Sequence, residues 1–153
     1  MMDKIPINVQ KVRNILADIN DSLEELKVFS GLTPEEFKKD KSNYGLAEHY
    51  LRRVLEGILT IGSHFLSRFP AKTRDYQQII LSLSEYGIIP VDFAEKNKKL
   101  AGYRNRLVHI YWEVSRGELL QVIKEHLVDL YAFIDYFSDV LKHPDKYGLT
   151  IEK

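Results

Sequence analysis

Apolar residues recur every three or four positions in several segments of this chain, and that spacing limits its fold more than any other feature. It is the spacing that places side chains on one face of an α-helix. The first such stripe runs through six residues, Val9, Val12, Leu16, Ile19, Leu23 and Leu26. Ser30-Gly31 ends the predicted helix, with Gly31 expected in the left-handed conformation. Alternation typical of a strand stands out only in residues 108–114, which are too isolated to build a sheet.

The next helices can be placed from their start signals and stripes. Thr33-Pro34-Glu35-Glu36 carries a capping box with proline in the first turn, which predicts the start of a short helix. A long helix then begins near Ser42 or Asn43 and is closed by Pro70. It carries a main stripe and a second one formed by Leu55, Leu59 and Leu66. The second stripe indicates either a subunit interface or a helix that is deeply buried in its own chain.

Three further helices complete the prediction. A short helix runs from Tyr76 to Gly87, another from about Pro90 to about Val108, and a last one ends where His143-Pro144 stops it. No internal repeat or linker interrupts them. We therefore expect one domain, residues 1–153, folded as an all-α, antiparallel four- or five-helix up-and-down bundle.

Composition excludes several kinds of site. At 153 residues the chain can bury a core without staples, and with no cysteine it has no disulfide, zinc–thiolate site or thiol nucleophile. No apolar run approaches the ~18 residues of a membrane span, and residues 1–14 lack the apolar run of a signal peptide, so we expect a cytoplasmic protein with no membrane contact. The 22 basic and 22 acidic residues balance, so any contact with nucleic acid must come from a local patch.

Arg104 interrupts an apolar face. In a helix that starts near Pro90, Leu100, Leu107 and Tyr111 share one side, and Arg104 falls among them. A buried guanidinium loses hydration, so an anion should meet it. One reading is a structural ion pair with Glu48 or Glu56 of the long helix. The other reading is a binding site for an anionic substrate.

The residues around Arg104 favour the second reading. Between Lys96 and Trp112 the chain has five basic residues and His109, but no carboxylate. Such a segment suits a phosphodiester, and we predict that Lys96, Lys99 and Arg106 form an RNA-binding patch. The other histidines show no metal-ligand spacing and are expected to be surface or hydrogen-bonded structural residues: His49, His64, His126 and His143.

The segment Arg104-Asn-Arg-Leu-Val-His109-Ile-Tyr111 carries a resemblance to a known family. Its arginine and histidine, separated by four residues and followed by x-Tyr, resemble the motif of HepT-like ribonuclease toxins in the HEPN superfamily. The similarity extends to the order of the helices, the Gly87-Ile-Ile-Pro90 lead-in and the apolar last helix. It therefore covers most of the chain.

The resemblance implies a metal-independent endoribonuclease toxin without a cofactor, working as a homodimer on RNA such as tRNA. It implies that Arg104 and His109 are catalytic, that Asn105 supports them, and that a nucleotidyltransferase antitoxin adds AMP to Tyr111. A histidine can exchange protons with the ribose and leaving oxygens, and a guanidinium can bind the phosphate. The sequence also lacks the clustered carboxylates of a two-metal nuclease. The alternative is a non-catalytic HEPN module that docks a nucleotidyltransferase or a nucleotide.

Helix geometry constrains how the two catalytic side chains could meet. Residues five apart on a straight helix differ by roughly 500°, or about 140° around the axis. Arg104 and His109 would therefore diverge on one straight helix. We predict that the helix ends or kinks between Leu107 and Trp112, or that the two residues meet across the dimer.

Overall fold

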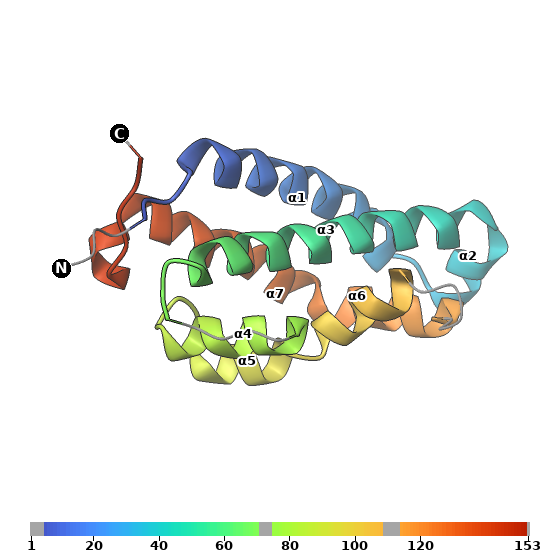
Figure 1. Ribbon diagram of the computed structural model, residues 1–153. Coiled ribbons are helices and arrows are strands. Elements are labelled where there is room, and N and C mark those ends of the chain that lie inside the picture. The colour runs from blue at the N-terminus through green and yellow to red at the C-terminus, as the bar shows by residue number, and fades with distance from the viewer. Residues whose placement is uncertain (1–4, 71–74, 109–113, 153) are drawn as a thin grey trace.

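The predicted apolar stripes form the core of the protein. The computed structural model describes residues 5–70, 75–108 and 114–152. Three long helices frame it: α1 (Val9–Ser30), α3 (Ser42–Leu66) and α7 (Arg116–Lys142) (Figure 1). From Val12 to Leu26 every member of the first stripe is buried, and the most exposed of them, Leu16, is 8% exposed. The all-α prediction is confirmed.

The helices alternate in direction as an up-and-down bundle. The Asn8 N–H at the start of α1 bonds to His64 near the end of α3, so these two helices are antiparallel. The next member consists of α5 (Val91–Asn97) and α6 (Leu100–Val108), and α7 returns antiparallel to it. Two ion pairs join α7 to this member: Lys96 pairs with Asp129, and Arg106 pairs with Glu118. The bundle predicted from the sequence is therefore observed.

Helix α3 lies at the centre of the bundle. It packs on α1 and α7 through one side and on α4 (Tyr76–Glu85) and α6 through the other. Both of its stripes are buried within the chain, since Leu55, Leu59 and Leu66 are at most 3% exposed. A Cβ added at Gly62 would lie 2.8 Å from the Ile79 side chain, so α4 packs closely there. Of the two explanations for the second stripe, burial within the chain holds, and the subunit interface is not needed.

The prediction of one helix from Pro90 to Val108 is wrong, because the helix breaks at Lys98 and Lys99. Asn97 is fully buried, and its side-chain amide donates to the carbonyl of Phe93, four residues earlier. Its amide oxygen also contacts Nδ1 of His126 on α7 at 3.1 Å. Short polar side chains that bond to nearby backbone compete with the helix ladder in this way. Because the helix breaks here, the direction of α6 beside α3 does not depend on that of α5.

The predictions made for two helix ends had different outcomes. Thr33 forms the predicted capping box at α2 (Pro34–Lys39). The left-handed conformation predicted for Gly31 is wrong, since its φ is −85°, and positive φ occurs instead at Gly87 and Gly148. After α7, a 3-10 helix η1 (Pro144–Tyr147) leads to a bridge between Ile7 and Ile151. Within the described residues, no helix is both long and apolar enough to cross a membrane.

Candidate active site

Helix α6 places Arg104 at the boundary between core and solvent. Leu100, Ala101 and Leu107 bury one face of the helix in the bundle. The Arg104 guanidinium lies over the ring of Tyr76 on α4, 4.5 Å from its centroid. Its Nη2 is 4.0 Å from Oε1 of Glu56 on α3, and the arginine side chain keeps 21% exposure. Glu56 is thus the partner anticipated for a structural pair, but the contact is too long for a hydrogen bond.

A groove of about 650 Å³ opens beside this arginine. Arg104, Glu56 and Tyr76 line one part of it, and α3 forms its floor through Leu59, Thr60 and residues further along the helix. A guanidinium at the wall of an open groove can still bind an anion with its free donors. Arg104 therefore has the accessibility that binding a substrate phosphate requires.

The other motif residues are described only in part. Asn105 accepts a hydrogen bond of 3.3 Å from Nη1 of Arg104, so the amide contacts the guanidinium. His109 and Tyr111 lie outside the described residues. Helix α6 is described as far as Val108, and Val114 and Ser115 are not helical. A straight helix through Ser115 is therefore excluded, and where the predicted end or kink falls lies outside the described residues.

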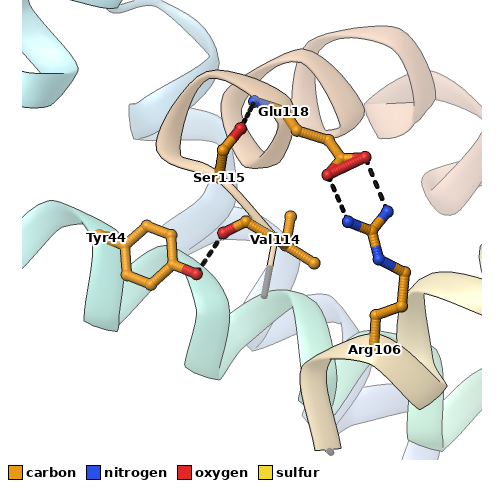
Figure 2. A network of polar contacts seen from close by, with 5 residues as sticks. All are labelled: Tyr44, Arg106, Val114, Ser115 and Glu118. Atoms are coloured by element: carbon orange, nitrogen blue, oxygen red, sulfur yellow. Dashed lines mark hydrogen bonds and ion pairs between the residues drawn. The ribbon is translucent and has the colours of Figure 1, made fainter. Parts of the chain in front are cut away.

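A polar network holds the chain on both sides of residues 109–113 (Figure 2). Before this segment, Arg106 donates two hydrogen bonds of 2.7 Å to the two carboxylate oxygens of Glu118 on α7. After it, the Tyr44 hydroxyl of α3 donates to the carbonyl oxygen of Val114. The network thus holds the chain just before and just after the segment that contains His109 and Tyr111.

The start of α7 explains why Glu118 is available for Arg106. The Ser115 hydroxyl accepts from the backbone N–H of Glu118 and caps the helix. The Glu118 carboxylate does not return to the cap and points to α6 instead (Figure 2). The hydrogen bonds from Arg106 lower the pKa of Glu118 below its usual value of 4.5. The pair is therefore charged on both sides at neutral pH.

The predicted RNA-binding patch is not gathered around Arg104. Lys96 pairs with Asp129 at 3.0 Å, and Arg106 pairs with Glu118, so both face α7. Lys99 is exposed in the break between α5 and α6. Arg104 instead faces α3 and α4. None of Lys96, Lys99 and Arg106 is among the described residues that line the groove.

Different residues, which the sequence did not single out, share the groove with Arg104. They include Tyr76 of α4, Lys11 of α1 and Arg68, just after α3. The one signal in the sequence was the spacing of His64 and Arg68, which are four residues apart as neighbours on a helix face are. Lys11 and Tyr76 reach the groove only through the packing of α1 and α4 on α3.

Comparison with known proteins identifies the relatives of this chain. The model of the ribonuclease HepT-like family matches residues 19–137. The tRNA nuclease HepT of Aphanizomenon flos-aquae is 24% identical over 102 residues, covering 66% of this chain and 69% of the relative. The mRNA nuclease HepT of Shewanella oneidensis is 26% identical over 126 residues, covering 80% and 92%.

A solved structure shares the fold. The tri-AMPylated Shewanella oneidensis HEPN toxin, in complex with MNT antitoxin, superposes with a TM-score of 0.73 at 23% identity. The superposition covers 84% of this chain and 96% of the toxin. The family match spans most of the bundle, from α1 to the second half of α7, and includes the Arg104–Tyr111 motif. The chain therefore belongs to the ribonuclease HepT-like family.

Proposed function

We propose that this protein is the toxin of a toxin–antitoxin pair, a homodimeric, metal-independent endoribonuclease whose reaction depends on Arg104 and His109. The observation that carries the proposal is the state of Arg104. Its guanidinium lies at an open groove, is held by a ring face and is only loosely paired with Glu56. That is how a cation reserved for a substrate phosphate should be placed.

The proposed reaction is a transesterification. The ribose 2′-oxygen attacks the adjacent phosphorus and loses its proton, while the bond from phosphorus to the 5′-oxygen breaks and that oxygen gains a proton. The imidazole of His109 would take the first proton or supply the second. Arg104 would stabilise the negative charge that builds on the phosphate, and Asn105 would orient the guanidinium. The products are a 2′,3′-cyclic phosphate and a 5′-hydroxyl.

The names of relatives support the proposed substrate, RNA, and the proposed partner, a nucleotidyltransferase antitoxin. One is named a tRNA nuclease and another an mRNA nuclease, which supports RNA as the substrate class. A structural neighbour is a toxin bound to an MNT antitoxin and modified with AMP. By analogy, a nucleotidyltransferase antitoxin would add AMP to Tyr111, two residues from His109. The added phosphate would compete with the substrate phosphate for Arg104.

The central test replaces His109. His109→Ala should abolish RNA cleavage while leaving the melting temperature of the protein unchanged, because the substitution removes the proton-transfer group. Cleavage is measured on labelled RNA with a chelator present. Equal cleavage by wild type and variant would overturn the assignment of His109. Wild-type protein that neither cleaves RNA nor arrests growth would favour a non-catalytic module that docks a nucleotidyltransferase.

Mixing two inactive variants reveals how the residues meet. Arg104→Ala and His109→Ala subunits form mixed dimers after exchange, and each mixed dimer has one intact pair only if the residues act across the dimer. Activity would then return to about a quarter of the wild-type value, since half the dimers are mixed and each has one of two sites. No recovery, with exchange confirmed by native mass spectrometry, would place both residues of a site in one protomer.

A further inference from the structure

The groove continues well beyond Arg104 along α3. Its floor includes Glu56, Thr60, Ser63 and Ser67, which recur at three and four positions and so share one face of the helix. Arg68, next to Ser67, lies at the far end. Twelve residues at 1.5 Å each separate Glu56 from Arg68, which corresponds to roughly 18 Å. The groove is therefore longer than one phosphate group at Arg104 needs.

The groove is also unusually positive for this chain. Lys11, Arg68 and Arg104 line it, and Glu56 is the one carboxylate among its described lining residues, which leaves a net charge of +2. The whole chain, in contrast, has a net charge of zero. Neither Lys11 nor Arg68 pairs with a carboxylate among the described residues, whereas Lys96, Lys98 and Arg106 do. Glu56 lies 4.0 Å from Arg104, and the charge of Glu152 acts on Arg68 from a longer distance. The groove therefore gathers three cations that carboxylates of the described residues neutralise only in part.

Contacts hold the far end of the groove in place. Arg68 donates to the carbonyl of His64 at 3.0 Å, to the Ser67 hydroxyl and to the carbonyl of Pro6 at 3.1 Å, so its guanidinium joins α3 to the segment before α1. His64 accepts a bond of 3.1 Å from the Asn8 N–H through Nε2. Burial and the charges of Arg68 and Lys11 lower the pKa of His64 to about 4. The ring is therefore neutral at pH 7, and both cations lie close enough to act on it.

We propose that this groove binds the RNA chain flanking the scissile bond, with Arg104 on the phosphate that reacts and with Lys11 and Arg68 on a neighbouring phosphate. The proposal rests on the proposed function, because it gives that reaction a second subsite. A phosphodiester chain is the ligand that fits, since it repeats one negative charge per nucleotide along a strand. Thr60 and Ser63 can add hydrogen bonds to the backbone of the RNA.

The test compares two cations in the same part of α1. Lys11 lines the groove, while Arg13 is exposed and does not line it. In a His109→Ala background, which keeps the RNA intact, Lys11→Gln should weaken binding of a single-stranded hexanucleotide about three- to tenfold. It should also reduce the slope of log affinity against log salt by roughly 0.7, the value for one single-stranded phosphate contact. Arg13→Gln should change neither quantity.

Substrate length separates this proposal from the proposed function. With His109 intact, Lys11→Gln should lower kcat/KM for the hexanucleotide by a similar factor but leave a dinucleotide unaffected, because a dinucleotide has only the phosphate that reacts. Arg68→Gln should repeat this pattern, with its melting temperature measured because it also loses contacts to Pro6 and His64. If the wild type cleaves RNA but Lys11→Gln behaves as Arg13→Gln on both lengths, the groove proposal alone fails.

One further outcome would overturn it, and another would separate it from the proposed function. Adenylyl groups on Tyr111 offer the same phosphate chemistry as RNA. If Lys11→Gln leaves RNA binding unchanged but alters the AMP content after co-expression with the transferase, the groove serves the modification instead. If no variant of Arg104 or His109 affects cleavage, the proposed function fails first, and a hexanucleotide that still depends on Lys11 would then mark a binding groove without that chemistry.

Discussion

Arg104 and Arg106 stand two residues apart on α6, yet the fold treats them in opposite ways. Arg106 makes two hydrogen bonds of 2.7 Å to Glu118, although its side chain is 34% exposed. Arg104 is more covered, at 21%, but its nearest carboxylate oxygen is 4.0 Å away. Burial alone would predict the reverse, since a covered cation has the greater need of a partner.

The difference separates a structural arginine from one that is available for chemistry. A bidentate pair fixes both of its members, and here it joins α6 to α7 on either side of the segment with His109 and Tyr111. A guanidinium held by a ring face keeps its orientation, and apart from the bond of 3.3 Å to Asn105 its donors remain open. The motif therefore contains one arginine that is paired within the fold and another that lines an open groove.

The largest expected effect comes from replacing each arginine in turn. Arg104→Ala should lower kcat by on the order of 10²–10³, as the loss of one donor to a charged transition state does. Arg104→Lys should recover little of this, because an ammonium lacks the planar fork. Arg106→Ala should cost less than about tenfold in kcat, since its loss affects stability first. Single-turnover cleavage rates measure both, and equal losses for Arg104→Ala and Arg106→Ala would remove the distinction.

An intermediate effect is expected when Glu118 loses its charge. Glu118→Gln should lower the free energy of unfolding by about 0.5–1 kcal/mol at pH 7, the range for a partly exposed pair. The folded-state pKa of Glu118 lies below its unfolded value of 4.5, so the stabilisation is present above that pH and is lost as pH falls through the folded pKa. Urea unfolding at pH 7 and at acid pH measures the effect.

The pH dependence is the check on this pair. The unfolding free energies of wild type and Glu118→Gln should converge as the pH falls from about 4.5 through the lower folded-state pKa, below which Glu118 is protonated in the folded wild type. Glu125→Gln is a suitable control, because that exposed carboxylate is on the same helix and is not bonded to Arg106. A difference between wild type and Glu118→Gln that stays constant with pH would show that charge pairing with Arg106 is not its source.

The smallest effect is expected at Glu56, the long contact of Arg104. Glu56→Gln should change stability by less than about 0.5 kcal/mol, because a 4.0 Å contact at a groove contributes little. It should raise the affinity for RNA about two- to threefold at low salt by removing the carboxylate from a positive groove, and this gain should fade as salt is added. A large loss of stability would mean that Arg104 is a structural residue after all.

Most of the fold followed from local patterns in the sequence. Stripes and caps determined α1, α3, α4 and α7 closely, because apolar spacing and end signals act within one helix. The break at Lys98 and Lys99 was missed because Asn97 can favour a break only once His126 and the core surround it. The sequence equally left open whether the second stripe of α3 faced another subunit, since burial by α4 and α6 depends on tertiary packing.

The site was predictable only where it is continuous in sequence. The motif from Arg104 to Tyr111 was recognised as a segment, and Arg104 lines a groove. The patch of Lys96, Lys99 and Arg106 was inferred from nearness in sequence, but two of these side chains turn to carboxylates on α7. Lys11 and Arg68 reach the groove of Arg104 from distant parts of the chain, and no local pattern can reveal such a meeting.

The chemistry of the cleaved end tests the central claim most directly. Mass spectrometry of RNA fragments made by the wild type in the presence of a chelator should show a 2′,3′-cyclic phosphate on one side of the break and a 5′-hydroxyl on the other. A single 2′-deoxyribose at the cleaved position should stop the reaction, because the attacking oxygen is missing. Fragments that carry a 5′-phosphate, or unhindered cleavage beside the deoxyribose, would contradict a reaction carried out by Arg104 and His109 through the ribose hydroxyl.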